Sequence, residues 1–163
     1  MKISKAEQKD YKAILALQYA AYQSEAIRYD NFYIPPLTQT LEQLIDEAKD
    51  GILLKATKEN VIVGSVRGAL HGTTCKIARL IVHPDVQGRG IGTHLLSEIE
   101  SFFAGVERFE LFTGAESLDN IRLYNRQGYT EFKKEKLTDQ ISLVFLQKRN
   151  KLWGQKQAAK GAL

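Results

Sequence analysis

The sequence predicts a single domain of the α+β class, in which strands and helices alternate in a mixed order. A length of 163 residues suits one domain and is enough to bury a sizeable core. Short apolar runs rich in β-branched residues alternate with stretches whose apolar residues recur at helical spacing. Glycine and proline residues separate these segments and no internal repeat is visible, so we expect one mixed αβ domain.

The N-terminal half is predicted to hold two helices and the first four strands. Ser4 and Glu7 have the spacing of a capping box, which predicts a helix start there, and Gly51 follows the second helix as its stop. In order, the expected elements are a strand at 3–5, a helix to about 23, an aromatic loop at 24–36, a helix over 41–48, and strands at 52–57, 61–70 and 74–82.

The C-terminal half is predicted to add two helices and three strands. An amphipathic helix follows a glycine loop, with its apolar residues on one side, and ends at Gly105. In order, the expected elements are a helix over 91–103, a strand at 108–113, a helix at 118–127, and strands at 129–133 and 141–146.

The glycine loop is the most informative segment of the chain. An apolar run stops at His83-Pro84, and glycines then occupy every second position, at Gly88, Gly90 and Gly92. A helix N-terminus has unpaired backbone N–H groups and partial positive charge, and glycines let the backbone close around an anion. The pattern therefore predicts a ligand that carries a pyrophosphate. The alternative is a tight turn before an ordinary core helix.

The spacing of the glycines distinguishes between kinds of phosphate loop. A dinucleotide loop has the spacing G-x-G-x-x-G, and a P-loop needs a lysine followed by serine or threonine, whereas this chain reads Gln87-Gly88-Arg89-Gly90-Ile91-Gly92. That string fits Q/R-x-x-G-x-G/A and resembles the acetyl-CoA loop of the GNAT N-acetyltransferase superfamily. A second segment, from Ser117 to Tyr129, resembles the next GNAT motif, a short helix with Asn and Leu-Tyr closed by Gly before an aromatic residue.

The resemblance implies a fold, a reaction and a cosubstrate. The expected fold is αβα layered, with a mixed, mostly antiparallel sheet of about seven strands that splays between the fourth and fifth. The expected reaction transfers the acetyl group of acetyl-CoA to a primary amine of a small molecule or of a protein or peptide. The alternatives are transfer of another acyl group, a CoA-binding regulatory module without catalysis, and an ordinary nucleotide-binding domain.

The resemblance also implies which residues hold the cosubstrate. Strand residues would bind the pantetheine and the thioester oxygen, and loop residues would bind the pyrophosphate. The family often has Asn seven residues before its tyrosine, where this chain has Ser117, and here Asn120 is the candidate. The expected cofactor-binding residues are Leu80, Ile81, Val82, Gln87, Gly88, Arg89, Gly90, Ile91, Gly92, Thr93 and Asn120.

Tyr124 is the candidate catalytic residue. A phenol suits a general acid for the departing thiolate, because its pKa of about 10 lies not far above that of a thiol. The alternative is a tyrosine packed in the core. No general base is identified: His71, Glu110 and Glu116 are candidates, and a water chain could serve instead.

The acceptor amine is expected to meet the aromatic and acidic segment 22–33. Aromatic rings and carboxylates suit a cationic amine through cation–π contact and charge pairing. We therefore expect Tyr29 and Tyr33 to contact the acceptor. The alternatives are packing of these rings between the two helices and a contact in a homodimer.

Composition limits the kinds of partner and the location that we expect for the protein. The tail from Lys148 to Leu163 holds five basic residues and no acidic one, and the remainder has 18 basic against 19 acidic residues. We therefore expect an acetyltransferase domain over 1–147 and a basic tail over 148–163, poorly ordered towards its end. A single cysteine, Cys75, fits a reducing cytoplasm, and no apolar stretch reaches the ~18 residues of a membrane span. Neither a metal nor a nucleic acid is expected.

Overall fold

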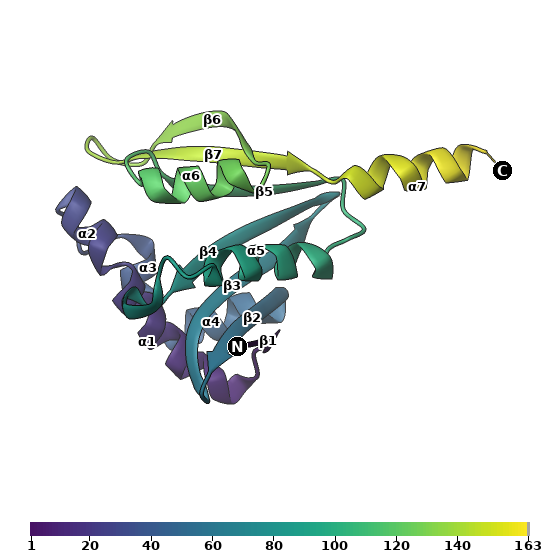
Figure 1. Ribbon diagram of the computed structural model, residues 1–163. Coiled ribbons are helices and arrows are strands. Elements are labelled where there is room, and N and C mark those ends of the chain that lie inside the picture. The colour runs from purple at the N-terminus through teal and green to yellow at the C-terminus, as the bar shows by residue number, and fades with distance from the viewer. Residues whose placement is uncertain (163) are drawn as a thin grey trace.

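The computed structural model describes residues 1–162 and holds sixteen elements in sequence (Figure 1). In chain order they are β1 (Lys2–Lys5), a 3-10 helix (Gln8–Asp10), α1 (Tyr11–Ala21), α2 (Gln23–Tyr29), α3 (Pro35–Thr38), α4 (Leu41–Lys49), β2 (Gly51–Lys58), β3 (Val61–His71), β4 (Thr74–Val82), a 3-10 helix (Pro84–Val86), α5 (Ile91–Phe102), β5 (Arg108–Gly114), α6 (Leu118–Arg126), β6 (Thr130–Lys136), β7 (Ser142–Arg149) and α7 (Lys151–Gly161).

The strands form one seven-stranded sheet in the order β1-β2-β3-β4-β5-β7-β6. All neighbours are antiparallel except β4 and β5, which are parallel and pair only through Thr74–Lys76 and Arg108–Glu110. Beyond that short contact the two strands diverge, and Figure 1 shows the two halves of the sheet opening away from the start of α7. The expected sheet, with its splay between the fourth and fifth strands, is confirmed.

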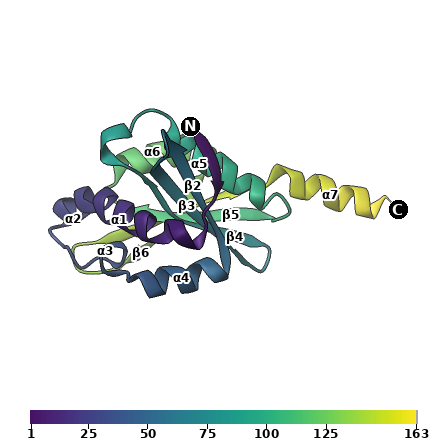
Figure 2. The same cartoon turned by 90° about the horizontal axis from the view of Figure 1, so that it is seen from below.

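Helices cover both faces of the sheet, as expected for αβα layers. One apolar cluster packs α1 and α4 on β2 through Ile14, Leu15, Leu44 and Leu53. A larger cluster packs α5 on the opposite face, and Figure 2 shows α4 and α5 on opposite sides of the strands. The described helices include none that combines the length and the apolar character needed to cross a membrane.

Two glycines of β3 let α5 lie close to the sheet. A Cβ atom on Gly68 would stand 2.6 Å from the Phe103 ring, and one on Gly64 would stand 2.8 Å from the Leu95 side chain. Real Cβ atoms do not approach so closely, so a larger residue at either position would push the α5 side chains away from β3. The consequence is a close approach of α5 to β3 along the length of the helix.

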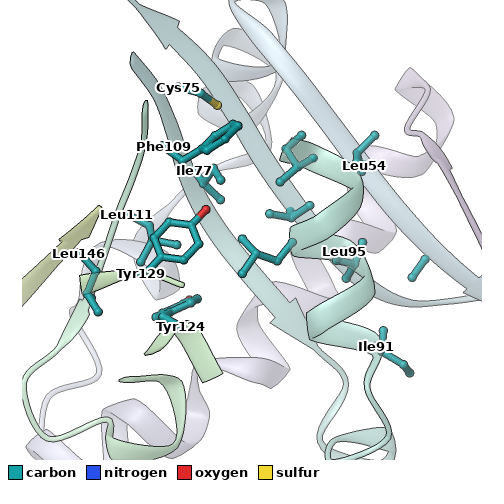
Figure 3. Close-up of a cluster of buried hydrophobic side chains, with 14 of the residues drawn as sticks. Leu54, Cys75, Ile77, Ile91, Leu95, Phe109, Leu111, Tyr124, Tyr129 and Leu146 are labelled. Carbon is teal, nitrogen blue, oxygen red and sulfur yellow. The ribbon is translucent and has the colours of Figure 1, made fainter. Parts of the chain in front are cut away.

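The large apolar cluster reaches across the splay and joins the two halves of the sheet. Tyr124 of α6 and Tyr129 have ring centroids 6.1 Å apart, and Figure 3 shows both rings between α5 and the half that carries Leu111 and Leu146. Both tyrosines are buried, with 6% and 1% of their surface exposed. The core itself therefore positions α6 beside the gap between β4 and β5.

The structure corrects two expectations for the N-terminal half. The capping box forms between Glu7 and Asp10 rather than between Ser4 and Glu7, because β1 continues through Ser4 to Lys5. The segment expected as an aromatic loop is helical in α2 and again in α3. Asp30, with a φ of +47°, ends α2 in the left-handed conformation that commonly closes a helix.

The C-terminal tail is more regular than the sequence suggests. Strand β7 continues to Arg149, so the sheet extends into the tail expected from residue 148. Asn150 then caps α7: its side chain accepts from the Leu152 N–H and donates to the carbonyls of Ala104 and Val106. The tail is therefore helical through Gly161, where loss of order was expected, and the division into 1–147 and 148–163 stays a prediction.

Candidate active site

A bulge in β4 shapes the strand where it leaves β5. Arg67 of β3 faces Ala78 and Ser65 faces Ile81, so two β4 residues, Arg79 and Leu80, stand opposite one residue of β3. Arg79 has a φ of +52°, a conformation that a non-glycine side chain adopts at a cost on the order of 1–3 kcal/mol. The bulge aims the Arg79 and Leu80 side chains into the gap between the two halves of the sheet.

The glycine loop connects this strand to α5. Gly88 and Gly90 have φ values of +74° and +81°, which only glycine adopts without strain, and Gly90 is the N-cap of α5. The Gln87 side chain donates from Nε2 to the Val82 carbonyl at 3.1 Å. Gln87 therefore anchors the loop to the end of β4.

The first turn of α5 offers backbone N–H groups to an anion. The N–H of His94 makes the first helical hydrogen bond, to the Gly90 carbonyl at 3.1 Å. The N–H groups of Ile91, Gly92 and Thr93 lie before that bond and have no carbonyl one helical turn back. A phosphate held there would also meet the positive end of the helix dipole.

A large cleft of about 820 Å³ runs along this loop, between α5 and α6. Nearly all the cofactor-binding residues expected from the sequence line it; the exception is Arg89. The lining residues are Ala21, Tyr22, Ser24, Glu25, Arg28, Leu80, Ile81, Val82, Val86, Gln87, Gly88, Gly90, Ile91, Gly92, Thr93, Ser117, Asp119, Asn120, Arg122, Leu123, Tyr124 and Arg126.

The positive charge in the large cleft comes from three arginines that are not among the residues expected from the sequence. Arg28 of α2 and Arg122 and Arg126 of α6 line the wall opposite the glycine loop. Arg122 pairs with Asp119 at 3.2 Å, whereas Arg126 has no ion pair within the described part of the chain. The i, i+4 spacing of Arg122 and Arg126 places both on one helix face and was the signal available in the sequence.

A second, small cavity of about 220 Å³ lies inside the splay. Most of its wall is apolar, with Arg79 and Glu25 as its charged residues. The lining residues are Tyr22, Glu25, Tyr29, Ile34, Pro35, Pro36, Ile77, Ala78, Arg79, Leu80, Leu111, Phe112, Thr113, Gly114, Asn120, Tyr124, Leu137, Ile141 and Leu143.

The large cleft and the small cavity meet at a junction of five residues. The residues that line both are Tyr22, Glu25, Leu80, Asn120 and Tyr124. They come from the end of α1, from α2, from the β4 bulge and from α6. A ligand that extends along the large cleft and a ligand in the small cavity would therefore touch at this junction.

Tyr124 is buried at the junction. Burial raises the pKa of Tyr124 well above its usual range, and the Tyr22 and Glu25 side chains raise it further. The phenol therefore keeps its proton at neutral pH. In the described part of the chain no side-chain hydrogen bond uses the Tyr124 hydroxyl, so this group is available to a ligand.

Asn120 and Ser117 both line the large cleft but have protein partners. Asn120 donates from Nδ2 to Thr113 Oγ1 at 3.2 Å, which ties α6 to the end of β5. The Ser117 hydroxyl lies 2.7 Å from both carboxylate oxygens of Glu25, and Arg28 contacts the same carboxylate at 2.6 Å. Glu25 is thus held at the junction by residues of two helix ends.

The two tyrosines expected to contact an acceptor lie in different surroundings. Tyr29 is 8% exposed, lines the small cavity and packs with Ile34 and Ile141. Its hydroxyl accepts from the Glu116 N–H at 3.0 Å. Tyr33 is 85% exposed and lines neither the cleft nor the cavity. Tyr29 therefore both packs in the core and lines the small cavity, whereas Tyr33 lies away from the junction.

None of the three candidate bases reaches the junction. His71 is exposed at the end of β3, and Glu110 of β5 pairs with Arg108 at 3.5 Å. Glu116 contributes only its backbone N–H beside the small cavity. Glu25, from the acidic and aromatic segment, is the carboxylate that lines both the large cleft and the small cavity.

Solved structures share this fold over almost the whole chain. The ribosomal-protein-S18-alanine N-acetyltransferase of Escherichia coli aligns with a TM-score of 0.76 and 17% identity, covering 91% of this chain and 93% of that one. The PaiA N-acetyltransferase of Thermoplasma acidophilum, crystallised with coenzyme A, aligns with a TM-score of 0.74 and 17% identity, covering 91% of this chain and 98% of that one. YncA of Salmonella typhimurium, crystallised with acetyl-CoA, aligns with a TM-score of 0.73 and 20% identity, covering 91% of this chain and 93% of that one. The expectation of acetyl-CoA as cosubstrate agrees with these complexes.

Sequence comparison gives the family. The UPF0157 protein YqkA of Bacillus subtilis is 28% identical over 120 residues, which are 72% of this chain. The chain spans about a third of that relative's length, since the match covers 34% of it. The model of the acetyltransferase (GNAT) family matches residues 11–129, from the start of α1 through the glycine loop and α6 to Tyr129. With the splayed sheet and the glycine loop in place, the conclusion is that this chain belongs to the acetyltransferase (GNAT) family.

Proposed function

We propose that the protein transfers the acetyl group of acetyl-CoA to a primary amine of a small molecule or of a protein or peptide. The observation that carries this proposal is the junction, where the cleft along the glycine loop meets a small cavity at the buried Tyr124. The arrangement brings a thioester and an amine together in one orientation, which is a large part of the catalysis of group transfer.

In this proposal the large cleft holds acetyl-CoA. The N–H groups at the start of α5 bind the pyrophosphate, and Arg126 and Arg122 face it from α6. The pantetheine runs along Leu80–Val82, where β4 has left β5 and its backbone groups are free to bind a ligand. The thioester then lies at the junction.

The chemistry needs one bond formed and one broken. The amine nitrogen attacks the thioester carbonyl carbon, the C–S bond breaks, and an amide and free CoA result. The departing sulfur takes the Tyr124 proton, and the attacking nitrogen loses a proton to water or to Glu25, which lines both sides of the junction. Tyr124 is restored by a proton from solvent.

A thiol-release assay across amine classes tests the proposed activity. Acetyl-CoA is supplied with polyamines, amino acids, aminoglycosides and peptides, and the free thiol is measured with and without each amine. We expect amine-dependent release and an acetylated product of matching mass. Propionyl-CoA and succinyl-CoA in parallel distinguish an acetyltransferase from a transferase of another acyl group, and release with none of these donors contradicts the proposal.

The Tyr124→Phe variant tests the proposed general acid. It removes one hydroxyl and keeps the buried ring, so kcat should fall by roughly 10²–10⁴ while the acetyl-CoA Kd stays within about twofold. Tyr129→Phe is the matched control, because Tyr129 lies beside Tyr124 but donates to Glu100 at 2.8 Å and lines neither the cleft nor the cavity. A Tyr124→Phe enzyme within twofold of the original, with chemistry limiting the rate, would make the residue structural.

A further inference from the structure

Arg79 brings an unbalanced positive charge to the small cavity. Its side chain lines the cavity, and its Nε is buried without a hydrogen-bond partner. Its guanidinium carbon stands 5.9 Å from the centre of the Tyr22 ring. A buried donor of a charged group that makes no hydrogen bond is costly, and such groups in native proteins generally have a partner.

The acidic residues nearby are already paired with other cations. Glu25, the carboxylate of the cavity wall, contacts Arg28 at 2.6 Å. Glu47 forms an ion pair with Arg67, and the positive charge of Arg79 acts against Arg67 as a like charge. In the described part of the chain no carboxylate lies within 4.0 Å of the Arg79 nitrogens. The Tyr22 side chain is thus the protein group that the structure shows beside the Arg79 guanidinium, and the charge has no carboxylate partner among the described residues, so it is left for an anionic ligand.

The strained backbone at Arg79 points to the same role. Arg79 and Leu80 are the two residues of the β4 bulge, and Arg79 holds its position at a φ of +52°. Arg79 lines the small cavity and its neighbour Leu80 lines the junction, so the bulge places a cation next to the junction. The rest of the wall is largely apolar, formed by residues such as Ile77, Ile141 and Leu143.

We propose that the acceptor is a small amino carboxylate, whose carboxylate binds Arg79 in the small cavity while its amine reaches the thioester at the junction. A guanidinium binds a carboxylate with two parallel hydrogen bonds, which gives orientation as well as affinity. The acceptor keeps its carboxylate throughout, and only its nitrogen gains the acetyl group and loses a proton. The proposal rests on the proposed acetyl transfer, and it names the substrate class of that same site.

The first experiment compares amino carboxylates with the same amines lacking the acid. Apolar α-, β- and γ-amino acids are each paired with the decarboxylated amine and with the amide, and kcat/KM is measured by thiol release. For at least one amino acid, kcat/KM should be tenfold or more above that of its decarboxylated amine and of its amide. The series with the highest kcat/KM shows which spacing between amine and carboxylate fits the site. Equal rates within each set, or a preference for a peptide N-terminus over every free amino acid, would overturn the proposal.

The second experiment changes Arg79 itself. Arg79→Gln keeps most of the side-chain length and removes the charge. The kcat/KM for the amino acid should therefore fall at least a hundredfold, because its KM rises. The rate with the decarboxylated amine should change less than threefold, and Arg79→Lys should recover part of the loss. Lys76→Gln is the matched control, because it removes one exposed positive charge from the same strand and lines neither the cleft nor the cavity. A loss of equal size for both substrates would contradict the assignment.

Failure of this inference can be distinguished from failure of acetyl transfer. If simple amines are acetylated and amino carboxylates are not, the transfer stands and the Arg79 assignment fails. If no amine is acetylated, calorimetry with the corresponding N-acetyl amino acids tests Arg79 directly. Binding that Arg79→Gln weakens at least tenfold supports the carboxylate site, and binding that does not depend on Arg79, or none at millimolar concentration, overturns it.

Discussion

At the scale of single residues, the junction is held together by side chains that satisfy one another. The Glu25 carboxylate accepts a hydrogen bond from the Ser117 hydroxyl and pairs with the Arg28 guanidinium. The Asn120 side chain donates a hydrogen bond to Thr113. These contacts connect α2 to the start of α6, and α6 to the end of β5. A site on such a framework is preorganised, and it does not have to be assembled when the substrates arrive.

Arg126 is expected to contribute to acetyl-CoA binding through its charge. It lines the large cleft and has no ion pair within the described residues, but it is exposed, so the effect is moderate. Arg126→Gln should weaken acetyl-CoA binding about threefold to tenfold in low salt, and the difference should shrink above about 0.5 M salt because of screening. Calorimetry at two salt concentrations measures the loss of acetyl-CoA affinity and its dependence on salt.

Arg89 gives the comparison for that experiment. The sequence suggests it as a cofactor contact, yet its side chain does not line the large cleft. We therefore expect Arg89→Gln to change the acetyl-CoA Kd less than twofold at either salt concentration. A larger effect of Arg89→Gln than of Arg126→Gln would reverse the assignment of the charged contacts.

At the scale of elements, the start of α5 is the part of the molecule that the proposed cofactor most depends on. Gly88 and Gly90 have positive φ, so any side chain there strains the loop whether or not a ligand binds. Gly92 differs: it carries no such strain, and a Cβ there would meet Leu123 at 3.5 Å, an ordinary contact. Gly92 is thus the position at which the cleft can be filled without disturbing the loop.

Gly92→Val should block the cofactor site and leave the fold intact. The new side chain would occupy the large cleft beside the first N–H groups of α5, so the acetyl-CoA Kd should rise at least tenfold, about 1.4 kcal/mol. Gly105→Val is the matched control, because Gly105 lies outside the cleft and has open space around it. Unchanged affinity in a folded Gly92→Val protein would refute the placement of the cofactor.

At the scale of the whole molecule, burial of titratable groups sets the stability at high pH. Burial raises the pKa of Cys75 to about 12, and it raises the pKa of Tyr124 and of Tyr129 above the usual range of a phenol. In each case the native state holds the proton more tightly than the unfolded chain. The stabilisation is therefore complete below the unfolded pKa and is lost as pH rises towards the folded one.

Unfolding in urea between pH 8 and 11 measures this loss. The free energy of unfolding should begin to fall near pH 9 from Cys75 and more steeply above pH 10 from the tyrosines, by up to about 1.4 kcal/mol per pH unit for each group. Cys75→Val removes one titrating group, so its stability should decline less between pH 9 and 10. A parallel decline in both proteins would show that Cys75 does not contribute.

Much of the fold and of the cofactor loop could be predicted from the sequence because the signals are local. The glycine spacing, the β4 run from Thr74 to Val82 and the helix of Tyr124 each depend on neighbouring residues, and all were placed closely. The parallel contact of β4 with β5, and so the splay, came from resemblance to a family rather than from propensity.

Only the tertiary structure decided which side chains meet at the junction. Glu25 and Ser117 are 92 residues apart in the chain and meet at the junction. The bulge at Arg79 depends on how β4 pairs with β3, and its side chain reaches a cavity because β4 leaves β5 beyond Lys76. The same packing leaves Arg89 and Tyr33 outside the cleft and the cavity. Local patterns determine where helices and strands form, but side-chain direction and burial depend on how distant segments pack. The sequence therefore determined the family, most of the elements and the glycine loop, and the packing of the two sheet halves determined the small cavity.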